Sequence, residues 1–437
     1  MRDRGVRLRG AVFLGACLLA GVASLQSVAA IAATRALPHA VPGAPTFIRG
    51  VGGWQQVTVG WNPPSSNGGQ RVSGYKATAT PGGHSCTTSN TSCVITHLQT
   101  GVNYRVTVRA TNKSGTGKPS AASPPLRPIP LILPGKAITY TTFAGAKVTL
   151  DPWLGRSVAV LTPPGSAFGY PTMTNVISAL DASWGDYASI TSKLPTPYSP
   201  TTYKGRDTIA VVVTSCGAAC SYIGYTGTEI NPSYFQTLYD GVKFHQQYDQ
   251  VQFYEFGRNF WFYDSRLGPN TTFGSTTTTG FAVLMRFQTM NDIGISGGPY
   301  NATPFPQFES QVWGLTGIYD ATLSDTFANT LAVGNSPGMY GGTDFFASIV
   351  HLLSTHYGGR CFVKDLFASI ATDPAISTDD GAVTNFVSSA SHVAGVDLGP
   401  LFYGHWAFPR ADGTTSARVA GGIASLPKPS AKGLCPA

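Results

Sequence analysis

The stretch Gln250–Asp264 reads QVQFYEFGRNFWFYD and combines groups that could do chemistry with closely spaced aromatic residues. The carboxylate of Glu255 could act as a general acid or base. Arg258 follows three residues later, so on a helix its guanidinium could pair with that carboxylate. We therefore take Glu255 as the candidate catalytic residue and Tyr254, Arg258 and Trp261 as candidate binding residues.

The spacing within this stretch predicts a helix. One stripe is apolar and follows the i, i+3, i+7 spacing of a buried helix face: Phe253, Phe256 and Phe260. The three candidate binding residues form a second stripe, with Glu255 between the two. A glycine costs a helix roughly 1 kcal/mol relative to alanine, so Gly257 indicates that another element packs against the backbone there.

The same residues match the zinc-peptidase pattern H-E-x-x-H only at its glutamate. Tyr254 and Arg258 stand where that pattern has its two histidine ligands. An arginine cannot release a proton to bind a cation, and a tyrosine phenol, with a pKa of about 10, is a poor zinc ligand. The stretch is therefore either the shell of a zinc site without its ligands or a buried aromatic helix with one ion pair. We predict no metal and no cofactor.

Other residues give weaker signals. His351 and His356 are five residues apart, which splays them on a helix, and the remaining candidates for a site are His245, His392, His405 and the pair Asp379-Asp380. The letters G-x-S-x-G occur at 294–298, but Pro299 follows and no helix is predicted there, so the setting of a nucleophile elbow is missing. A catalytic triad assembled from distant residues stays open.

Composition points to an exported chain. The 437 residues are too many for one core, and only 11% of them are charged, against about 25% in an average soluble domain. Residues 1–32 have a basic start, an apolar stretch and a small-residue site, so we predict a cleaved signal peptide over an uncleaved anchor. The leader contributes +3 of the net charge of +8, and the remaining +5 includes no basic run that would suit nucleic acid. No later segment is predicted to span a membrane.

Six cysteines lie beyond the predicted leader, and an even number in an exported chain indicates disulfides. Proximity favours the pairs Cys86–Cys93 and Cys216–Cys220, which leaves Cys361–Cys435. Six cysteines allow fifteen connectivities, so this pairing rests on sequence distance alone.

Residues 41–130 contain short alternating strands separated by turn signals, and they resemble a fibronectin type III domain. The resemblance rests on Trp61 with Pro63-Pro64, Gly74-Tyr75, Gly101 with Tyr104, and Ala110-Thr111-Asn112. It implies an immunoglobulin-like β-sandwich with Trp61 and Tyr75 in the core. It also implies that the Tyr104 hydroxyl bonds back to the backbone. A spacer role is favoured over ligand binding.

Residues 131–136 form a proline-rich linker, and residues 137–437 a second domain of α+β type. Strands are predicted at 137–150, 158–161 and 208–213, and helices at 172–194, 234–243, 250–264, 345–356, 364–371 and 383–394. Residues 270–279 are polar and predicted to form a loop.

This second domain resembles the secreted gluzincin peptidases, which include the enhancin-like, mucin-degrading enzymes. The resemblance rests on Y-E-F-G-R-N-F at 254–260, Tyr357-Gly358, and D-L-G-P-L-F-Y-G-H-W-A-F-P at 397–409. It covers about half of the domain, and only Glu255 matches a functional position. No downstream glutamate ligand can be placed, since the first, Glu309, is far away in sequence.

The combined prediction is a secreted, extracellular pseudoenzyme that binds a glycan or a peptide through Tyr254, Arg258 and Trp261. Its partner is an extracellular glycan or protein, and not nucleic acid. The alternative is a secreted hydrolase that acts on protein or polysaccharide with Glu255 as acid/base. A structural or adhesive surface protein is a third possibility. Whether the chain is an enzyme stays open at this point.

Overall fold

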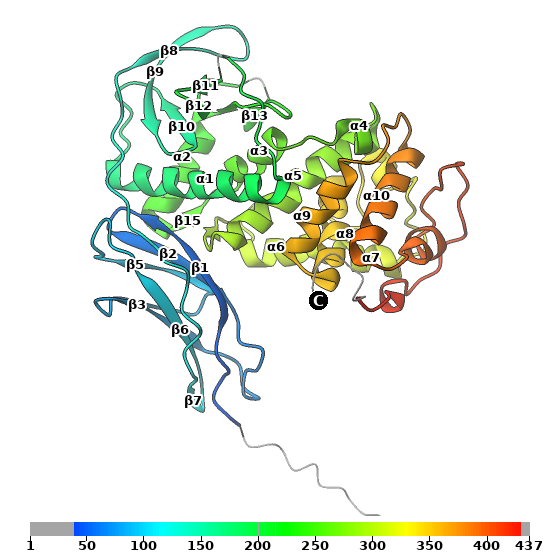
Figure 1. Cartoon of the computed structure of the whole chain (residues 1–437), viewed down its shortest axis with the longest axis horizontal. Helices are drawn as coiled ribbons and strands as arrows, with labels where there is room; N and C mark the ends of the chain where they lie inside the picture. Colours follow the sequence, from blue (N-terminus) through cyan, green and yellow to red (C-terminus); the bar gives the residue numbers. More distant parts are fainter. Residues whose placement is uncertain (1–38, 200, 215, 430–437) are drawn as a thin grey trace, which may run out of the picture. The chain divides into compact units, whose positions relative to one another are not determined.

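The computed structural model describes residues 39–199, 201–214 and 216–429 (Figure 1). The predicted signal peptide, residues 1–32, lies outside the described residues. Within the described ranges, none of the helices combines the length and the apolar character that crossing a bilayer requires.

The N-terminal part is a β-sandwich of two antiparallel sheets. The first sheet has the order β1-β2-β5 and comprises β1 Thr46–Gly53, β2 Gln56–Asn62 and β5 Ser92–Thr96. The second has the order β4-β3-β6-β7 and comprises β3 Gly74–Thr80, β4 Ser85–Thr88, β6 Arg105–Asn112 and β7 Gly115–Thr116. Alternation in β6 is strict, with every second residue buried between the sheets.

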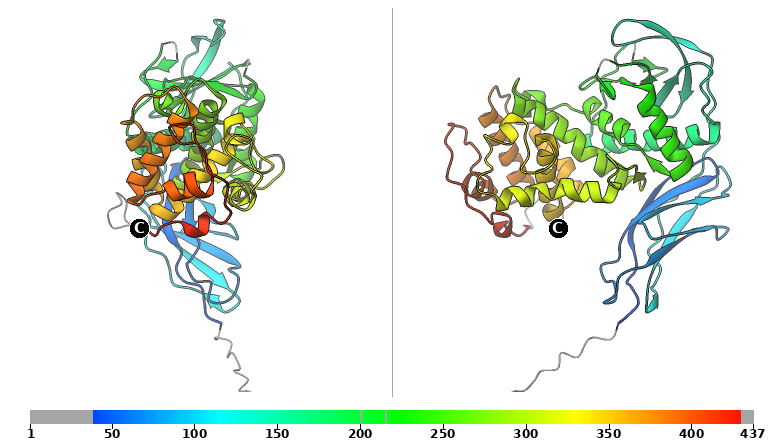
Figure 2. Two further views of the ribbon diagram at one scale, coloured as in Figure 1. Left: turned by 90° about the vertical axis from the view of Figure 1, so that its right-hand side faces the viewer. Right: turned by 180° about the vertical axis from the view of Figure 1, so that it is seen from behind.

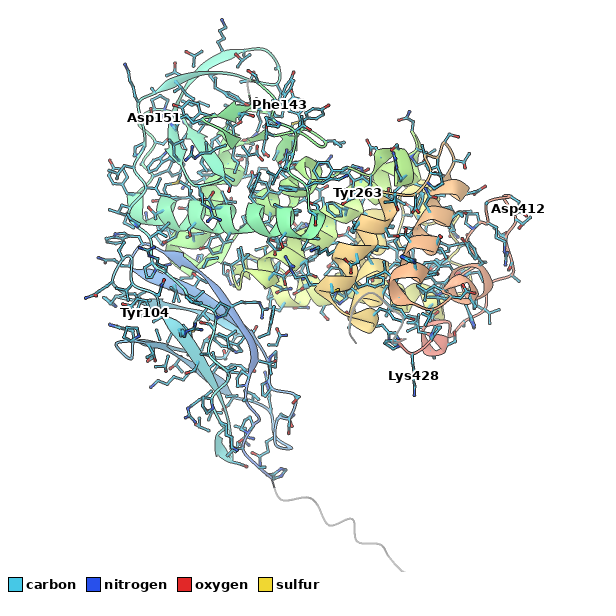
Figure 3. The ribbon with its side chains drawn as sticks, viewed as in Figure 1. Tyr104, Phe143, Asp151, Tyr263, Asp412 and Lys428 are labelled. Atoms are coloured by element: carbon cyan, nitrogen blue, oxygen red, sulfur yellow. A yellow bond between two sulfur atoms is a disulfide. The ribbon has the colours of Figure 1, made fainter. Side chains whose placement is uncertain are left out.

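The sandwich core confirms what the sequence implied for three aromatic residues. Trp61 and Tyr75 are buried and their ring centroids lie 5.4 Å apart. The Tyr104 hydroxyl (residue labelled in Figure 3) accepts a hydrogen bond from the backbone N–H of Gln99 at 3.0 Å. That bond fixes the turn before β6, as predicted.

Two of the three predicted disulfides are confirmed. Cys86 and Cys93 are bonded, and because they belong to β4 and β5 the bridge joins the two sheets of the sandwich. Cys216 and Cys220 are also bonded. The third predicted pair needs Cys435, which lies outside the described residues.

The predicted linker, residues 131–136, has neither helix nor strand. Its Ile132 N–H donates to the Thr174 hydroxyl at 2.8 Å, and the Gly135 N–H donates to the Pro152 carbonyl at 2.7 Å. The chain from there onward is mixed α and β. The domain boundaries at 41–130, 131–136 and 137–437 stay predictions.

A mixed sheet begins this second part. Its order is β13-β14-β12-β10-β9-β8, with the short β11 Thr202–Tyr203 added to β12. The strands are β8 Ile138–Thr141, β9 Lys147–Leu154, β10 Val158–Thr162, β12 Arg206–Val211, β13 Ala219–Ser221 and β14 Thr228–Ile230. β10, β12 and β14 run parallel, whereas β13 pairs antiparallel with β14 at one edge.

Helices follow, and some of them pack on the sheet. α1 Tyr170–Thr191 packs on β10 and runs across the sheet in Figure 1. The other helices of eight or more residues are α2 Pro232–Asp240, α3 Val251–Asn259, α5 Thr272–Asp292, α6 Phe305–Trp313, α8 Gly342–Tyr357, α9 Arg360–Ile370 and α10 Asp379–Ala394. α5 packs on both α3 and α8, and the views in Figure 2 show α5, α8, α9 and α10 grouped together.

Several predicted elements are confirmed with ends that differ by at most four residues, including α1, β10, β12, α8 and α10. Three predictions were wrong. The strand predicted at 137–150 is two strands, β8 and β9, with a turn at 142–146 between them. The helix predicted at 250–264 ends at Asn259, and a separate short helix, α4 Asp264–Leu267, follows it. The loop predicted at 270–279 is mostly the first two turns of α5, whose N-cap residue Thr271 accepts a bond from the Gly274 N–H at 3.1 Å.

Candidate functional site

The apolar face of α3 anchors the site. Phe253, Phe256 and Phe260 are completely buried, as the spacing predicted. Tyr187 of α1 stacks on Phe260 with ring centroids 5.3 Å apart, and its hydroxyl donates to the Phe253 carbonyl at 2.7 Å. Because this face is fixed against α1, the positions of Tyr254 and Arg258 on the less buried side of α3 are fixed as well.

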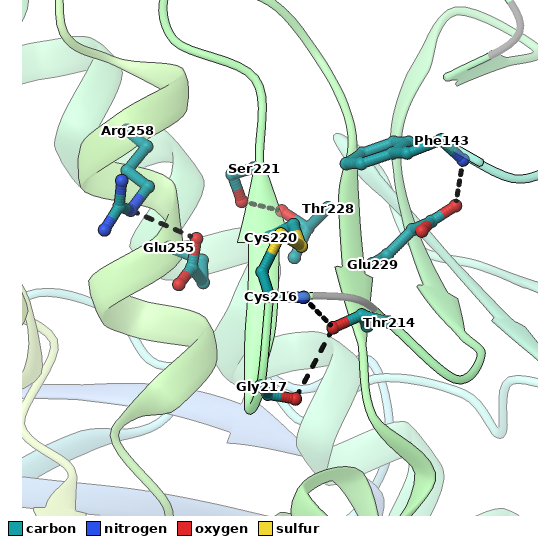
Figure 4. The surroundings of a disulfide bond; sticks show 10 residues. All are labelled: Phe143, Thr214, Cys216, Gly217, Cys220, Ser221, Thr228, Glu229, Glu255 and Arg258. Carbon is teal, nitrogen blue, oxygen red and sulfur yellow. Dashed lines mark hydrogen bonds and ion pairs between the residues drawn. A yellow bond between two sulfur atoms is a disulfide. The ribbon is translucent and has the colours of Figure 1, made fainter.

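Glu255 and Arg258 form the predicted ion pair, with the Arg258 Nε 3.5 Å from the Glu255 Oε2 (Figure 4). The Glu255 side chain is only 6% exposed, whereas that of Arg258 is 31% exposed. Burial raises the pKa of Glu255, and the charge of Arg258 and the Ser221 hydroxyl partly oppose that rise. Burial alone would lower the pKa of Arg258, but Tyr254 and Glu255 raise it above its ordinary value.

Tyr254 lies between two guanidinium groups. Its hydroxyl accepts a hydrogen bond from Arg258 Nη2 at 3.1 Å, so the two side chains that occupy the zinc-ligand positions of H-E-x-x-H do meet. The Arg286 guanidinium lies 5.8 Å from the centre of the Tyr254 ring, and it pairs with Asp344 at 3.6 Å. Arg258 therefore lies beside Glu255, and the same guanidinium holds the Tyr254 phenol.

Trp261 is not part of the same surface. α3 ends before it, and the Trp261 side chain is 1% exposed, with its ring against Tyr263 and Phe281 at centroid distances of 5.2 and 5.4 Å. Its indole N–H donates to Asp264 Oδ1 at 2.5 Å. The structure thus brings Glu255, Arg258 and Tyr254 together and leaves Trp261 in the core, so Trp261 is not a ligand contact in this conformation.

The residues around Glu255 do not fit a zinc ion. Arg258 cannot coordinate a cation, and its guanidinium is held by Glu255 and Tyr254. Glu309, the first downstream glutamate, instead accepts hydrogen bonds from Asn291 at 2.7 Å and Trp313 at 3.3 Å. Within residues 39–199, 201–214 and 216–429, no three His, Cys, Asp or Glu side chains are grouped so that they could hold a metal ion.

The two histidines of α8, His351 and His356, each contact other parts of the fold. The His351 ring is stacked on Trp313 with centroids 4.0 Å apart, and burial lowers the pKa of His351 to about 4. His356 Nε2 lies 3.0 Å from the Pro427 carbonyl oxygen. Asp379 and Asp380 occupy the first turn of α10, where carboxylates stabilise the helix dipole.

A cleft of about 780 Å³ opens beside the C-terminal end of α3. Arg258 and Ile223 line it together with the residues that precede α5 and with the first two turns of that helix. From α5 it is lined by hydroxyl-bearing side chains: Thr272, Ser275, Thr278 and Thr279. Asp264 is the one carboxylate in its lining. The cleft thus offers hydroxyls, an amide from Asn270, and charges of both signs.

Sequence reasoning missed the wall formed by α5 because residues 270–279 were assigned to a loop. A signal was present, since Thr271 precedes the apolar Phe273 as an N-cap residue would. Sequence reasoning also missed Asn259, which is completely buried at the end of α3. Its amide donates to three carbonyls of one turn, those of Tyr222 at 3.2 Å, Tyr225 at 2.7 Å and Gly227 at 3.1 Å.

Comparison with known proteins identifies the N-terminal sandwich. Residues 42–125 match the sequence model of the fibronectin type III domain, so this part of the chain is a fibronectin type III domain. The domain is thereby confirmed within the range that the sequence predicted.

Solved structures match only part of the chain. Domains A168-A170 from titin match with 25% identity and a TM-score of 0.19, covering 21% of this chain and 33% of the titin chain. The twitchin kinase region from C. elegans matches with 25% identity and a TM-score of 0.20, covering 25% of this chain and 20% of that one. The protein described as a myokine matches with 19% identity and a TM-score of 0.18, covering 20% of this chain and 98% of its own. The chain thus spans about a third of the titin structure and a fifth of the twitchin structure.

Proposed function

We propose that the part of the chain after the fibronectin type III domain is a binding domain on a zinc-peptidase-like scaffold and does not act as a zinc peptidase. The observation that carries this proposal is the Glu255–Arg258 ion pair, with Tyr254 hydrogen-bonded to the same guanidinium. The Arg258 guanidinium and the Tyr254 phenol stand at the two positions from which imidazoles would hold zinc. The family resemblance itself is part of the proposal.

The arrangement of α3 and the sheet edge also supports a ligand of extended form. β13 is the edge strand of the sheet, it runs antiparallel to β14, and it packs on α3. An edge strand can pair with an extended chain through its backbone groups. The cleft at the end of α3 has Arg258 on its wall, and Ile223, two residues after β13, also lines it, so an extended peptide or glycan is the expected ligand class. The presence of a cleft at α3 favours this function over a purely adhesive role.

The proposal includes an extracellular location. Two disulfides and a fibronectin type III domain are consistent with an exported protein. In that setting the fibronectin type III domain acts as a spacer, and the ligand is an extracellular glycan or protein.

Metal content tests the proposal directly. The purified full-length chain, incubated with zinc and desalted, should retain no stoichiometric zinc by atomic emission. The matched variant Tyr254→His/Arg258→His places two imidazoles at i and i+4 where the present side chains already meet, and it should retain more zinc than the wild type. One tightly held zinc in the wild-type chain would reject the proposal.

A second candidate function is hydrolysis with Glu255 as acid/base. The raised pKa of Glu255, caused by burial, favours it, because a general acid must hold its proton near the working pH. Turnover of protein and polysaccharide substrates should then disappear in Glu255→Gln and persist in Trp313→Phe, which changes a side chain outside the cleft lining. Absence of Glu255-dependent turnover rejects this candidate.

A further inference from the structure

Four aromatic side chains form a continuous cluster near the cleft. Phe143, in the turn between β8 and β9 (labelled in Figure 3), lies 4.3 Å from Tyr222 between ring centroids. Tyr222 lies 5.1 Å from Tyr198, and Tyr198 lies 6.1 Å from Tyr225. We call these four residues the tyrosine platform. Large apolar surfaces are usually buried, yet Tyr198 is 43% and Tyr225 is 46% exposed.

The platform is held in place by hydrogen bonds from several elements. The Phe143 N–H donates to Glu229 Oε1 at 2.7 Å, as Figure 4 shows. The Tyr198 N–H donates to the Thr226 hydroxyl at 3.0 Å. The amide of Asn259 binds the Tyr222 and Tyr225 carbonyls. These bonds fix the backbone that carries the four rings, so little backbone entropy is lost when a ligand packs on them, which favours binding.

The platform is continuous with the cleft through one short turn. Ile223 lies between Tyr222 and Tyr225, is 42% exposed, and lines the cleft next to Arg258. The Gly224 N–H donates to the Arg258 carbonyl at 3.0 Å, which ties this turn to the end of α3. A ligand that extends beyond the cleft on this side therefore meets exposed aromatic rings.

The chemistry of these surfaces selects among possible ligands. Aromatic faces pack against the C–H faces of pyranose rings, and hydroxyl and amide groups bind sugar hydroxyls. The cleft lining carries one guanidinium, Arg258, which is paired with Glu255, and one carboxylate, Asp264. Neither sign of charge is in excess, so a neutral ligand rich in hydroxyl groups fits better than an acidic or basic one.

We propose that the tyrosine platform and the adjoining cleft form one binding surface for a neutral oligosaccharide chain. The inference rests on the proposed binding function and specifies its ligand class. Sugar rings pack on Tyr198 and Tyr225, and the chain continues past Ile223 toward Arg258 and the hydroxyl groups of α5.

Calorimetric titration of the full-length chain tests this inference. The probes are cellohexaose, chitohexaose, xylohexaose and mannohexaose, with a hyaluronan hexasaccharide and an extended neutral decapeptide as alternatives. At least one neutral hexasaccharide should bind the wild type. Tyr198→Ala/Tyr225→Ala should weaken that binding at least about tenfold, since stacking on one aromatic ring contributes on the order of 1 kcal/mol or more.

Two control variants separate stacking from other effects. Tyr198→Phe/Tyr225→Phe keeps both rings and should retain binding within about threefold, a change of under 1 kcal/mol. Tyr234→Ala removes a tyrosine of equal exposure, 43%, from α2, outside the platform, and should leave binding unchanged. Circular dichroism and thermal unfolding confirm that each variant is folded.

Three outcomes overturn the inference: no neutral hexasaccharide binds, the alanine double variant binds as the wild type does, or only the charged hexasaccharide binds. Peptide binding that weakens in Arg258→Gln but not in Tyr198→Ala/Tyr225→Ala also overturns it and leaves the proposed binding function standing. Platform-dependent saccharide binding with Glu255-dependent hydrolysis supports the surface and rejects the proposed non-catalytic function.

Discussion

Gly257 of α3 faces Ala282 of α5 so closely that a Cβ added to Gly257 would lie 2.4 Å from the Ala282 Cα. The contact explains why a glycine interrupts an otherwise helix-favouring stretch, as the sequence predicted. It also sets the distance between α3, which carries Glu255 and Arg258, and α5, which forms the opposite wall of the cleft.

Gly257→Ala should therefore destabilise the protein, although alanine is the better helix former. The new methyl group must push α5 away, and overpacking of this kind costs about 1–3 kcal/mol. Gly185→Ala is the matched control, because Gly185 lies within α1 and has nothing within 4 Å of an added Cβ. It should be neutral or stabilise by up to about 1 kcal/mol. Urea unfolding checks both, and equal effects would contradict the packing argument.

The pair formed by Glu255 and Arg258 predicts a pH-dependent stability. Burial raises the folded-state pKa of Glu255 above the ordinary value of 4.5, so its contribution to the free energy of unfolding falls as the pH rises above 4.5. Arg258 opposes this rise, and Arg258→Met should steepen the fall. At pH 8 the free energy of unfolding of Arg258→Met should be lower than that of the wild type by about 2 kcal/mol. This is less than the cost of breaking a fully buried pair, because the Arg258 side chain is 31% exposed.

The double variant Glu255→Gln/Arg258→Met is the control for that prediction. It has no carboxyl at position 255, so the extra slope seen in Arg258→Met should disappear. Free energies of unfolding at several pH values between 4.5 and 8 give the comparison. If Arg258→Met and the double variant have the same slope, Glu255 is not the group responsible.

The sequence predicted the buried face of α3 but not its end. The phenylalanine spacing depends only on helix geometry, so the burial of Phe253 and Phe256 could be predicted from the sequence. The helix stops at Asn259 without a following glycine or proline to signal it, and the Asn259 side chain donates to the backbone of a distant turn. Once the helix ended, the spacing argument no longer applied to Trp261.

The cleft and the tyrosine platform were beyond sequence reasoning for a related reason. α5 contains four consecutive threonines, which are poor helix formers, so the sequence indicates a loop there. Tertiary contacts override that preference, since Thr277 is completely buried. The platform joins residues 143, 198, 222 and 225, and no local pattern links positions that far apart.

The buried carboxyl group of Asp207 on β12 should cause a second pH-dependent change in the free energy of unfolding. Burial raises its pKa to about 7, although it accepts hydrogen bonds from the Gly227 N–H at 2.6 Å and the Trp184 indole at 3.3 Å. Its contribution to stability should fall as the pH rises from about 4 to about 7. Asp207→Asn should flatten that fall by about 2–4 kcal/mol over the window.

Asp412→Asn is the control for Asp207, because Asp412 is exposed and the Thr414 hydroxyl and N–H lower its pKa. Because its pKa is lowered, Asp412 contributes stability that rises with pH in the acid range. Asp412→Asn should remove that rise and leave the free energy of unfolding at neutral pH with the same pH dependence as the wild type. Free energies of unfolding between pH 3 and 8 for the wild type and both variants make the comparison. An unchanged slope in Asp207→Asn would mean that the two donated hydrogen bonds keep this carboxyl ionised.

The Cys86–Cys93 bridge should stabilise the fibronectin type III domain, because it closes a loop with a sequence separation of 7 and joins the edge strands of two sheets. Chain entropy gives about 2.5 kcal/mol for a loop of that size. Cys86→Ser/Cys93→Ser should therefore lower the free energy of unfolding of the sandwich by about that amount. Cys216→Ser/Cys220→Ser is the matched control, since it removes a similarly short bridge that lies beside β13 and outside the sandwich. Hydrogen exchange of the β6 amides reports on the sandwich alone, and faster exchange in the control than in the Cys86/Cys93 variant would contradict this assignment.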